Sequence, residues 1–285
     1  MKRLSLLCCL ICLLIPGSVA LSQPFSPFMV DTGVVPNPAR GSQYSIGVAS
    51  NGDGWRVAFW DLNGYSIRTS GIGPDGSLLD KRGGLVAHSR GSAPPGQARA
   101  IVGIGSGFLT VWMAERDSAI WAARLDPLGV PIDSFPVFTG RGDQAEPAVA
   151  FDGDSTCLVV WTDIRSGGAG GNIHGLRVTT GGRVLDTNLI PIAEDPGWEA
   201  LLPTVAYGQG VYLVAWTAFD TSYSLGVVAR AARVSPGGAV LDTGLYLRHD
   251  PAASQMFPSV AFGDTCFLVA WSEWKDPTSA NLQRF

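Results

Sequence analysis

The amino-acid sequence predicts an all-β protein made of five copies of one four-stranded unit, and three observations support this prediction. First, a segment of two apolar runs around a Gly/Asp turn recurs in five places: 47–60, 101–112, 149–161, 205–216 and 260–271. Second, these segments end in tryptophans at intervals of 52, 49, 55 and 55 residues: Trp60, Trp112, Trp161, Trp216 and Trp271. A period near 50 is typical of a propeller blade. Third, after residue 20 no apolar residues recur at helical spacing behind a capping residue, so we expect almost no helix.

The order of the strands follows from the repeat. Its first strand is the small, apolar run written PAVAF or PSVAF, and its second strand ends in the tryptophan. A polar loop, a third strand ending in arginine, a glycine turn and a fourth strand that opens on Leu-Asp or Ile-Asp complete the unit. Alanine, valine and glycine suit a crowded central axis, so we expect the first strand to be innermost. The tryptophans on the second strand are expected to pack between neighbouring blades.

An arginine and an aspartate recur in the second hairpin of the unit. The spacing is 12 residues in the first copy and 9 in the next three: Arg68 and Asp80, Arg124 and Asp133, Arg177 and Asp186, Arg233 and Asp242. We interpret these as cross-strand pairs near the rim, where a partly exposed pair contributes only about 0.2–1 kcal/mol to stability. They therefore indicate strand register rather than a charged binding site.

The two ends of the chain complement each other. Arg284, in the terminal sequence NLQRF, has no aspartate after it, whereas Asp31 in FMVDTGVVP matches Asp242 in AVLDTGLYL. The strand around 28–35 is therefore predicted to pair with the strand ending at Arg284 and to complete the last blade. The predicted fold is a five-bladed β-propeller with four antiparallel strands per blade, closed by this N-terminal strand. An open array or a swapped assembly is the structural alternative.

The predicted organisation is a signal peptide over residues 1–20 followed by a single propeller domain over residues 21–285. The blades are expected at about 44–90, 98–140, 146–193 and 202–249, with the fifth formed by about 257–285 together with 28–35.

The first twenty residues have the features of a secretory signal. Lys2 and Arg3 precede an apolar run from Leu4 to Ile15, and small residues follow at Ser18-Val19-Ala20. The run is shorter than the roughly 20 apolar residues that a membrane-spanning helix needs. We therefore expect a secreted or periplasmic protein without a membrane span.

Charge and cysteine content narrow the partners. Without residues 1–20 the chain has 18 Lys and Arg, which is 20 less Lys2 and Arg3, against 24 Asp and Glu, a net charge of −6. A mildly acidic surface argues against nucleic acid and anionic membranes as partners. Cys157 and Cys266 are too few for a disulfide framework, and we expect both to be buried thiols.

The pattern P-x-V-A-F, then L-V-x-W, then R-V-x-x-x-G-x-x-L-D covers nearly all of the chain after residue 20. It resembles the repeats of secreted bacterial β-propeller proteins of unassigned function. The resemblance implies a five-bladed, lectin-like architecture but no particular activity, because propellers include lectins, hydrolases and scaffolds. The Gly-His and Trp-Asp dipeptides of WD repeats are absent from the expected places, and the S-x-D-x-G-x-T-W box of sialidases does not occur.

Catalytic and metal-binding signatures are sparse. A glycosidase needs two carboxyl groups facing its substrate. The predicted inner strands, SIGVAS, AIVGIG, AVAFDG, TVAYGQ and SVAFGD, carry only Asp152 and Asp264, both in turns. No G-x-S-x-G elbow occurs, and His88, His174 and His249 stand singly, without a zinc motif. We therefore expect no catalytic residue, no metal and no cofactor.

The loops that follow the second strands and those that join the blades are predicted to emerge on one face, the long-loop face. They bring aromatic rings near acids, and the candidate ligand-binding residues are Trp198, Trp274, Tyr223, Asp163, Asp220 and Asp276. A ring that stacks on a sugar, beside carboxylates that accept from its hydroxyls, is a common arrangement in sugar recognition. The alternative is that these residues cap and pack the loops, since none recurs in every blade.

The sequence thus predicts an exported, non-catalytic and monomeric protein that binds an extracellular glycan or protein through the long-loop face. One alternative is a glycoside-active enzyme with loop-borne carboxylates, for which Asp163, Asp220 and Asp276 are the candidates. The other is a purely structural module without a small-molecule ligand.

Overall fold

The computed structural model of the chain describes residues 43–61, 66–73, 76–77, 79–80, 83–88, 100–114, 118–140, 142–164, 171–220, 226–242, 244–247 and 253–275. The chain divides into two units, 1–38 and 39–285, and all the described residues belong to the second. Regular secondary structure in these ranges consists of β-strands. A search of the same ranges finds no helix that is long and apolar enough to cross a membrane.

Eighteen strands form five antiparallel sheets in the described ranges, and we number the sheets as blades in chain order. Blade 1 contains β1 (Gln43–Ser50), β2 (Trp55–Asp61), β3 (Ser66–Ile72) and β4 (Gly84–His88). Blade 2 contains β5 (Ala100–Ile104), β6 (Gly107–Ala114), β7 (Ala119–Leu125) and β8 (Pro131–Thr139). Blade 3 contains β9 (Asp143–Phe151), β10 (Thr156–Ile164), β11 (Asn172–Thr179) and β12 (Ile190–Ala193). Blade 4 contains β13 (Trp198–Gly208), β14 (Val211–Asp220), β15 (Val227–Val234) and β16 (Leu245–Tyr246). The described part of blade 5 is the hairpin of β17 (Ala253–Gly263) and β18 (Cys266–Lys275).

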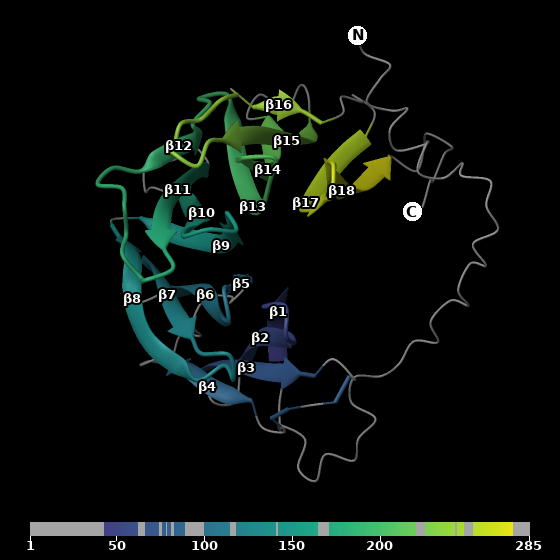
Figure 1. The fold of residues 1–285 in the computed structure, drawn as a ribbon. Coiled ribbons are helices and arrows are strands. Elements are labelled where there is room, and N and C mark those ends of the chain that lie inside the picture. Colours follow the sequence, from purple (N-terminus) through teal and green to yellow (C-terminus); the bar gives the residue numbers. More distant parts are fainter. Residues whose placement is uncertain are drawn as a thin grey trace, which may run out of the picture. The chain divides into compact units, whose positions relative to one another are not determined.

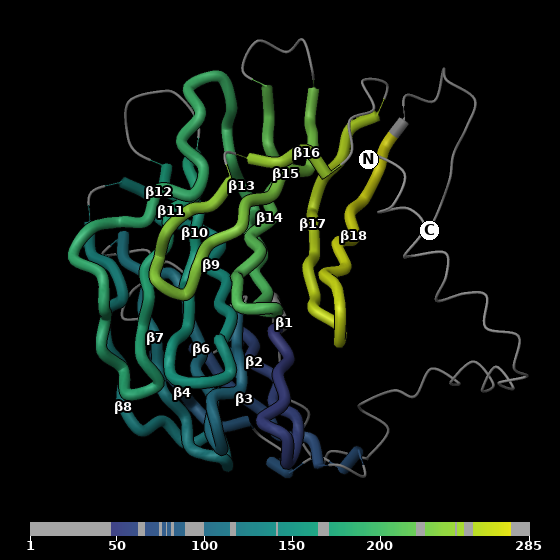
Figure 2. Tube along the Cα trace, turned by 45° about the horizontal axis from the view of Figure 1, so that its top comes forward, coloured from purple at the N-terminus to yellow at the C-terminus, as the bar shows by residue number. Residues whose placement is uncertain are grey.

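The blades follow one another through their first strands. β1 lies against β5, β5 against β9, β9 against β13, and β13 against β17, and Figure 1 shows these five strands nearest the centre. Figure 2 shows the hairpins β13–β14 and β17–β18 as neighbouring pairs. The structure confirms the predicted five-bladed β-propeller of antiparallel strands. The predicted closing strand at 28–35 and its partner ending at Arg284 lie outside the described residues.

The hydrophobic core lies between the blades rather than within them. Trp161 of blade 3 packs in one cluster with Leu109 and Val111 of blade 2. Trp216 of blade 4 packs in another cluster with Leu158 and Val160 of blade 3, and both indoles are almost completely buried. Truncating a buried ring of this size typically costs about 3–5 kcal/mol. The prediction that the tryptophans fill the space between blades is confirmed at these two positions.

The prediction that Trp60 belongs to the tryptophan series is wrong by one residue. In blade 3 the tryptophan stands three residues after Leu158, which pairs with Arg177. The corresponding pair in blade 1 is Arg56 with Gly71, so Phe59 occupies the tryptophan position and Trp60 lies on the opposite face of β2. The displacement arises within the strand and not in the turn. The turn of blade 1, where Ser50 pairs with Trp55, is as long as those of blades 2 and 4, where Gly103 pairs with Phe108 and Tyr207 with Tyr212.

Three of the four predicted arginine–aspartate pairs are confirmed. The shortest contacts, between Arg124 and Asp133, Arg177 and Asp186, and Arg233 and Asp242, measure 2.5, 2.6 and 2.7 Å. The neighbouring guanidinium, chiefly through its hydrogen bonds, holds the pKa of Asp133 and of Asp242 below the ordinary range.

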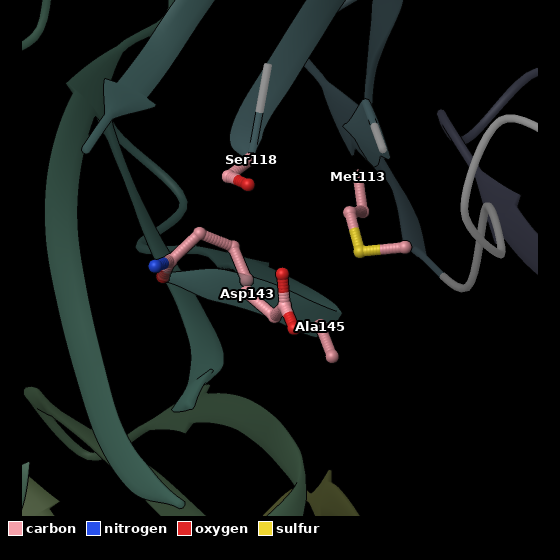
Figure 3. A pocket seen from close by; sticks show the side chains of 5 residues that line it. Met113, Ser118, Asp143 and Ala145 are labelled. Atoms are coloured by element: carbon pink, nitrogen blue, oxygen red, sulfur yellow. The ribbon is translucent and has the colours of Figure 1, made fainter. Parts of the chain in front are cut away.

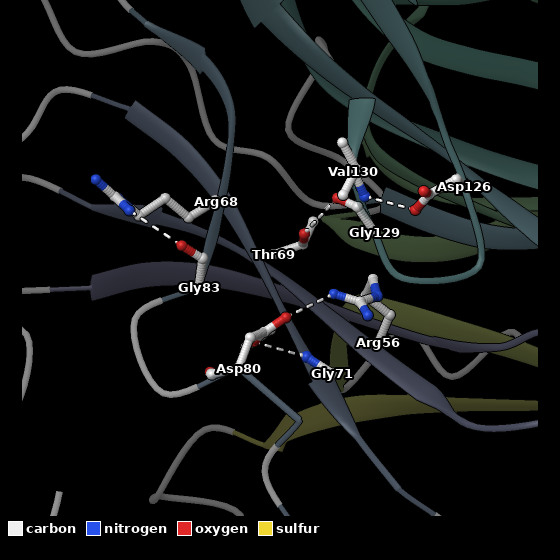
Figure 4. A network of polar contacts seen from close by, with 10 residues as sticks. Arg56, Arg68, Thr69, Gly71, Asp80, Gly83, Asp126, Gly129 and Val130 are labelled. Carbon is white, nitrogen blue, oxygen red and sulfur yellow. Dashed lines mark hydrogen bonds and ion pairs between the residues drawn. The ribbon is translucent and has the colours of Figure 1, made fainter. Parts of the chain in front are cut away.

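The fourth predicted pair is wrong. Asp80 binds Arg56, at 3.0 Å, and Arg68 instead lies 3.3 Å from Asp61. Gly71 rather than Arg68 stands at the arginine position, nine residues before Asp80 (Figure 4).

Candidate functional site

Three carboxylates lie on innermost strands, contrary to the prediction that these strands carry acids only in their turns. β9 begins at Asp143 and also carries Glu146, and β13 carries Glu199. The strands extend beyond the predicted ends because pairing continues past Pro147 and Pro203, so that Asp143 lies opposite Ile164 and Glu199 opposite Phe219. A proline lacks the N–H for a sheet ladder and usually marks a strand end. For that reason the predicted inner strands begin after Pro147 and Pro203 and leave these acids out.

A β-bulge allows each inner strand to pass its proline. Glu146, Leu202 and Phe257 each precede a proline and have positive φ values of 56, 58 and 56°. The register of the strand pair shifts at the same place in blades 3, 4 and 5. Such a backbone is unusual for residues other than glycine. Bulges bend a strand and redirect its side chains, and they are frequent next to active sites.

The carboxylate of Glu146 bridges blades 3 and 4. Its Oε2 accepts a hydrogen bond from Thr162 Oγ1 at 3.2 Å and another from the backbone N–H of Leu202 at 2.7 Å. Because one donor lies in each blade, the contacts hold the carboxylate in a single position between two inner strands.

A cavity of about 220 Å³ lies between blades 2 and 3, and of these acids Asp143 lines it. Met113 and Ser118 line it from blade 2, and Asp143, Gln144 and Ala145 line it from β9 (Figure 3). A second cavity of about 280 Å³ shares Ser118 and Asp143. Asp143 is solvent-exposed, so its carboxylate is available to a molecule that enters from solvent.

A chain of hydrogen bonds leads from the cavity wall into blade 3. Gln144 Oε1 accepts from Trp161 Nε1 at 2.5 Å, and Gln144 Nε2 donates to Asp163 Oδ1 at 3.0 Å. Asp163 Oδ2 lies 2.8 Å from His174 Nδ1, and His174 Nε2 lies 2.5 Å from Glu194 Oε1. Asp163 is 0% exposed and the Glu194 side chain is 50% exposed, so the chain runs from a buried carboxylate to a surface one.

The predicted ligand-binding residues are placed in different environments. Trp274 is 68% exposed on β18. Trp198 lies opposite Asp220 on the β13–β14 hairpin, and Asp220 is buried. The guanidinium carbon of Arg230 lies 5.2 Å from the ring centroid of Trp198, so this ring already stacks on a cation of the protein. Asp163 is held inside blade 3 as described above.

Two more of the predicted residues, Tyr223 and Asp276, lie outside the described residues.

The cysteines differ from one another. Cys157 is buried, and burial raises its pKa to about 12, so it is an unreactive thiol. Cys266 is exposed, which corrects the prediction that both are buried. In the ranges that the structure describes, no three His, Cys, Asp or Glu side chains are grouped as they would be around a metal ion.

No protein-family model and no curated protein sequence matches this chain. Among solved structures, an endo-arabinase from Bacteroides thetaiotaomicron matches with a TM-score of 0.51 at 12% identity, covering 82% of this chain and 90% of the other. A thermostable family-43 glycoside hydrolase matches with a TM-score of 0.48 at 15% identity, covering 85% and 88%. An α-L-arabinofuranosidase from Podospora anserina in complex with cellotriose has a TM-score of 0.46 at 12% identity, covering 79% of each chain.

The likeness to the endo-arabinase, at a TM-score of 0.51, contradicts the prediction of a non-catalytic binding protein. The prediction was wrong because the inner strands expected from the sequence do not include Asp143, Glu146 and Glu199. At identities of 15% and below, the likeness itself concerns the fold alone, and the fold shared with the endo-arabinase is the β-propeller.

Proposed function

We propose that this protein is a glycoside hydrolase whose carboxylates come from the innermost strands β9 and β13. The observation that carries this proposal is the position of Asp143, Glu146 and Glu199 on two adjacent inner strands, with Asp143 in the wall of a cavity. Hydrolysis of a glycosidic bond needs two carboxyl groups, one to protonate the leaving oxygen and one to act as nucleophile or to activate water. Inner strands supply such groups from a rigid frame.

The repeat relates two of the three acids to each other. Asp143 and Glu199 each stand four residues before the proline of their inner strand, at equivalent positions in blades 3 and 4. Glu146 lies in the bulge, and its carboxylate reaches from blade 3 to the backbone of blade 4. The proposed acid and base are therefore Asp143 together with either Glu146 or Glu199.

The size of the cavity suits a small part of a carbohydrate. Pockets for drug-sized ligands usually occupy about 300–1,000 Å³, whereas the cavity at Asp143 has about 220 Å³. This volume favours recognition of a single sugar residue. The apolar side chain of Met113 and the hydroxyl of Ser118 in its wall can contact the two kinds of surface that a sugar presents.

Hydrolysis of a panel of chromogenic glycosides and polysaccharides tests the proposal, and arabinan belongs in the panel because the endo-arabinase shares the fold. The wild-type chain should release product from at least one substrate. Asp143→Asn and at least one of Glu146→Gln and Glu199→Gln should lower kcat by about 10²–10⁴-fold, the usual contribution of a general acid or base.

Asp133→Asn is the matched control, because Asp133 forms a rim pair with Arg124 and should leave kcat unchanged. Glu146→Gln keeps an oxygen that can accept from Leu202, so its fold should persist and its thermal unfolding should match the wild type. No hydrolysis across the panel, or full activity in all three variants, would show that the protein is not this kind of enzyme.

We further propose that the protein is exported, acts on an extracellular carbohydrate and is monomeric. The charged start, short apolar run and small residues of 1–20 support export. N-terminal sequencing of the exported protein should begin at Leu21, and light scattering of that protein should give the mass of one chain. An uncleaved N-terminus would contradict export through this signal.

A further inference from the structure

Blades 1 and 3 have the same repeat, and each contains a buried carboxylate at the equivalent position. Asp163 lies opposite Gln144 in blade 3, and Asp61 lies opposite Gln43 in blade 1.

On the neighbouring third strand His174 stands opposite Trp161, and Arg68 stands opposite Phe59, which occupies the tryptophan position. Arg68 Nε is 3.3 Å from Asp61, just as His174 Nδ1 is 2.8 Å from Asp163. Blade 3 therefore has a histidine where blade 1 has a permanent cation.

Blade 4 also has a cation at the same place. Arg230 lies opposite Trp216 and contacts Asp195 at 3.3 Å. Its blade has Ala200 and Ala218 in the places of Gln144 and Asp163. Among these three blades, His174 is the one occupant of the position that also has a neutral form.

The hydrogen bonds around His174 require two protons on its ring when both neighbouring carboxylates are ionised. A carboxylate oxygen only accepts hydrogen bonds, and a neutral imidazole has a single N–H to donate. His174 has Asp163 on one ring nitrogen and Glu194 on the other. Asp163 is completely buried, and a buried carboxylate is stable only beside a cation or a full set of donors.

We propose that His174 is a positioning residue of the cavity wall, which acts as the protonated partner of Asp163 and through Asp163 on Gln144. The orientation of the Gln144 amide is unambiguous, because Trp161 Nε1 only donates and Asp163 only accepts. Gln144 is a neighbour of Asp143 on β9 and lines the same cavity. When His174 loses its proton, one carboxylate contact is lost, and Gln144 and the adjoining wall become less ordered.

Other charged groups near His174 are few in the described part of the chain. From its own blade it meets Asp163 and Glu194, while Asp195 is directed to Arg230 and the Glu146 carboxylate to blade 4. The described residues of blade 2 present uncharged side chains here: Phe138 stacks on Trp161 with centroids 5.3 Å apart, and Met113 and Ser118 line the cavity. The interaction needs a bound proton, so the stability that it contributes is present at low pH and is lost as pH rises.

Thermal unfolding between pH 5.5 and 9 of the full chain and of three variants tests the proposal. At pH 5.5, His174→Gln should melt about 6–12 °C below the wild type, because removing one partner of a buried ion pair is costly. The difference should shrink as pH rises, because the wild type then loses the same interaction. His174→Arg, which copies blade 1, should keep the wild-type stability and remove this part of the pH dependence. His88→Gln, at an exposed histidine of β4, is the matched control and should follow the wild type.

Long-range ¹H–¹⁵N spectra of the wild-type imidazoles provide a measurement that does not depend on any variant. Both ring nitrogens of His174 should carry a proton at pH 5.5 in the folded protein. A neutral ring at that pH, or a gap between wild type and His174→Gln that stays constant with pH, would overturn the positioning role.

This inference rests on the proposed function only in treating the cavity as a substrate site. If the wild type hydrolyses no glycoside but the pH-dependent gap is observed, the proposed function fails and the role of His174 stands. If hydrolysis occurs and the gap is absent, the reverse holds. Should both be observed, His174→Gln should lower kcat/KM more than His174→Arg does.

Discussion

Arg56 and Asp80 form an ion pair in which the arginine comes from the second strand of its blade rather than the third. Gly71 occupies the usual arginine position, and a Cβ atom there would lie 2.7 Å from Arg56 Nη2. A Cβ atom on Gly129 of blade 2 would lie 2.2 Å from Arg56 Nη1. The guanidinium carbon is also 5.9 Å from the ring centroid of Phe108. Both glycines therefore leave space for an arginine that is buried between blades 1 and 2 (Figure 4).

Moving the arginine from position 56 to position 71 should restore the arrangement of the other blades. Arg56→Leu should cost about 1–3 kcal/mol, because Asp80 keeps bonds from Ser70 and Gly71 and partial contact with water. Gly71→Arg should cost about 2–4 kcal/mol through overlap with Arg56. The double variant should cost less than the sum by about 1–3 kcal/mol. Urea unfolding followed by tryptophan fluorescence measures all three, and additive costs would show that the residues do not exchange roles.

At the scale of the element, the bulged inner strand links neighbouring blades. Its positive-φ residue presents a backbone N–H to the preceding blade: Leu202 donates to Glu146 of blade 3, and Phe257 donates to Thr217 Oγ1 of blade 4 at 3.1 Å. The two acceptors differ. Thr162 follows Trp161 as Thr217 follows Trp216, and in blade 3 this threonine donates to Glu146. The carboxylate of Glu146 thus lies between the threonine hydroxyl of its own blade and the N–H of the next blade, which brings a charged group to an inner strand.

Thr217→Val should destabilise the protein by about 1–3 kcal/mol, because it leaves the N–H of Phe257 without its acceptor in a part-buried place. Thr110→Val is the matched control. Thr110 is equally buried but donates to the carbonyl of Ala100, and a carbonyl tolerates the loss of one partner better than an N–H does. Chemical unfolding of both variants gives the comparison, and equal costs would mean that the N–H of Phe257 finds another acceptor.

At the scale of the whole molecule, the faces of the first and last blades differ from the faces between blades. Leu213 of blade 4 is 8% exposed against blade 5, whereas Leu268, at the same place in blade 5, is 60% exposed. On the matching side of blade 1, Val48 and Trp55 are 55% and 52% exposed. These apolar faces are the ones that closure of the last blade, as predicted from the sequence, would bring into contact.

Removal of the N-terminal strand predicted at 28–35 should therefore lower stability. A chain that lacks residues 1–37 should melt more than about 5 °C below one that lacks residues 1–20, because blade 5 loses its outer strand. A chain that lacks residues 1–27 is the control and should melt like the longer one. Thermal unfolding followed by tryptophan fluorescence measures the difference. Equal melting of all three chains would contradict closure by this strand.

The sequence by itself determined the all-β class, the five blades and three of the four rim pairs. These features depend on short segments that repeat, such as the nine-residue spacing of Arg177 and Asp186, and hairpin geometry is local. The position of Phe59 and the partner of Asp80 were missed, because Trp60 and Arg68 match the repeated residue types but stand one and three residues away from the repeated positions, which only the strand register shows.

Only the tertiary structure decided which acids belong to the candidate site. Asp143 and Glu146 precede or adjoin a proline that resembles a strand end, and only pairing with β10 shows that the strand continues through a bulge. The buried link from Gln144 through Asp163 to His174 joins three strands that are separated in sequence by loops. A single histidine carries no local signal of such a role. Its significance arises from long-range contacts, in which a buried carboxylate needs a cation or a full set of hydrogen-bond donors.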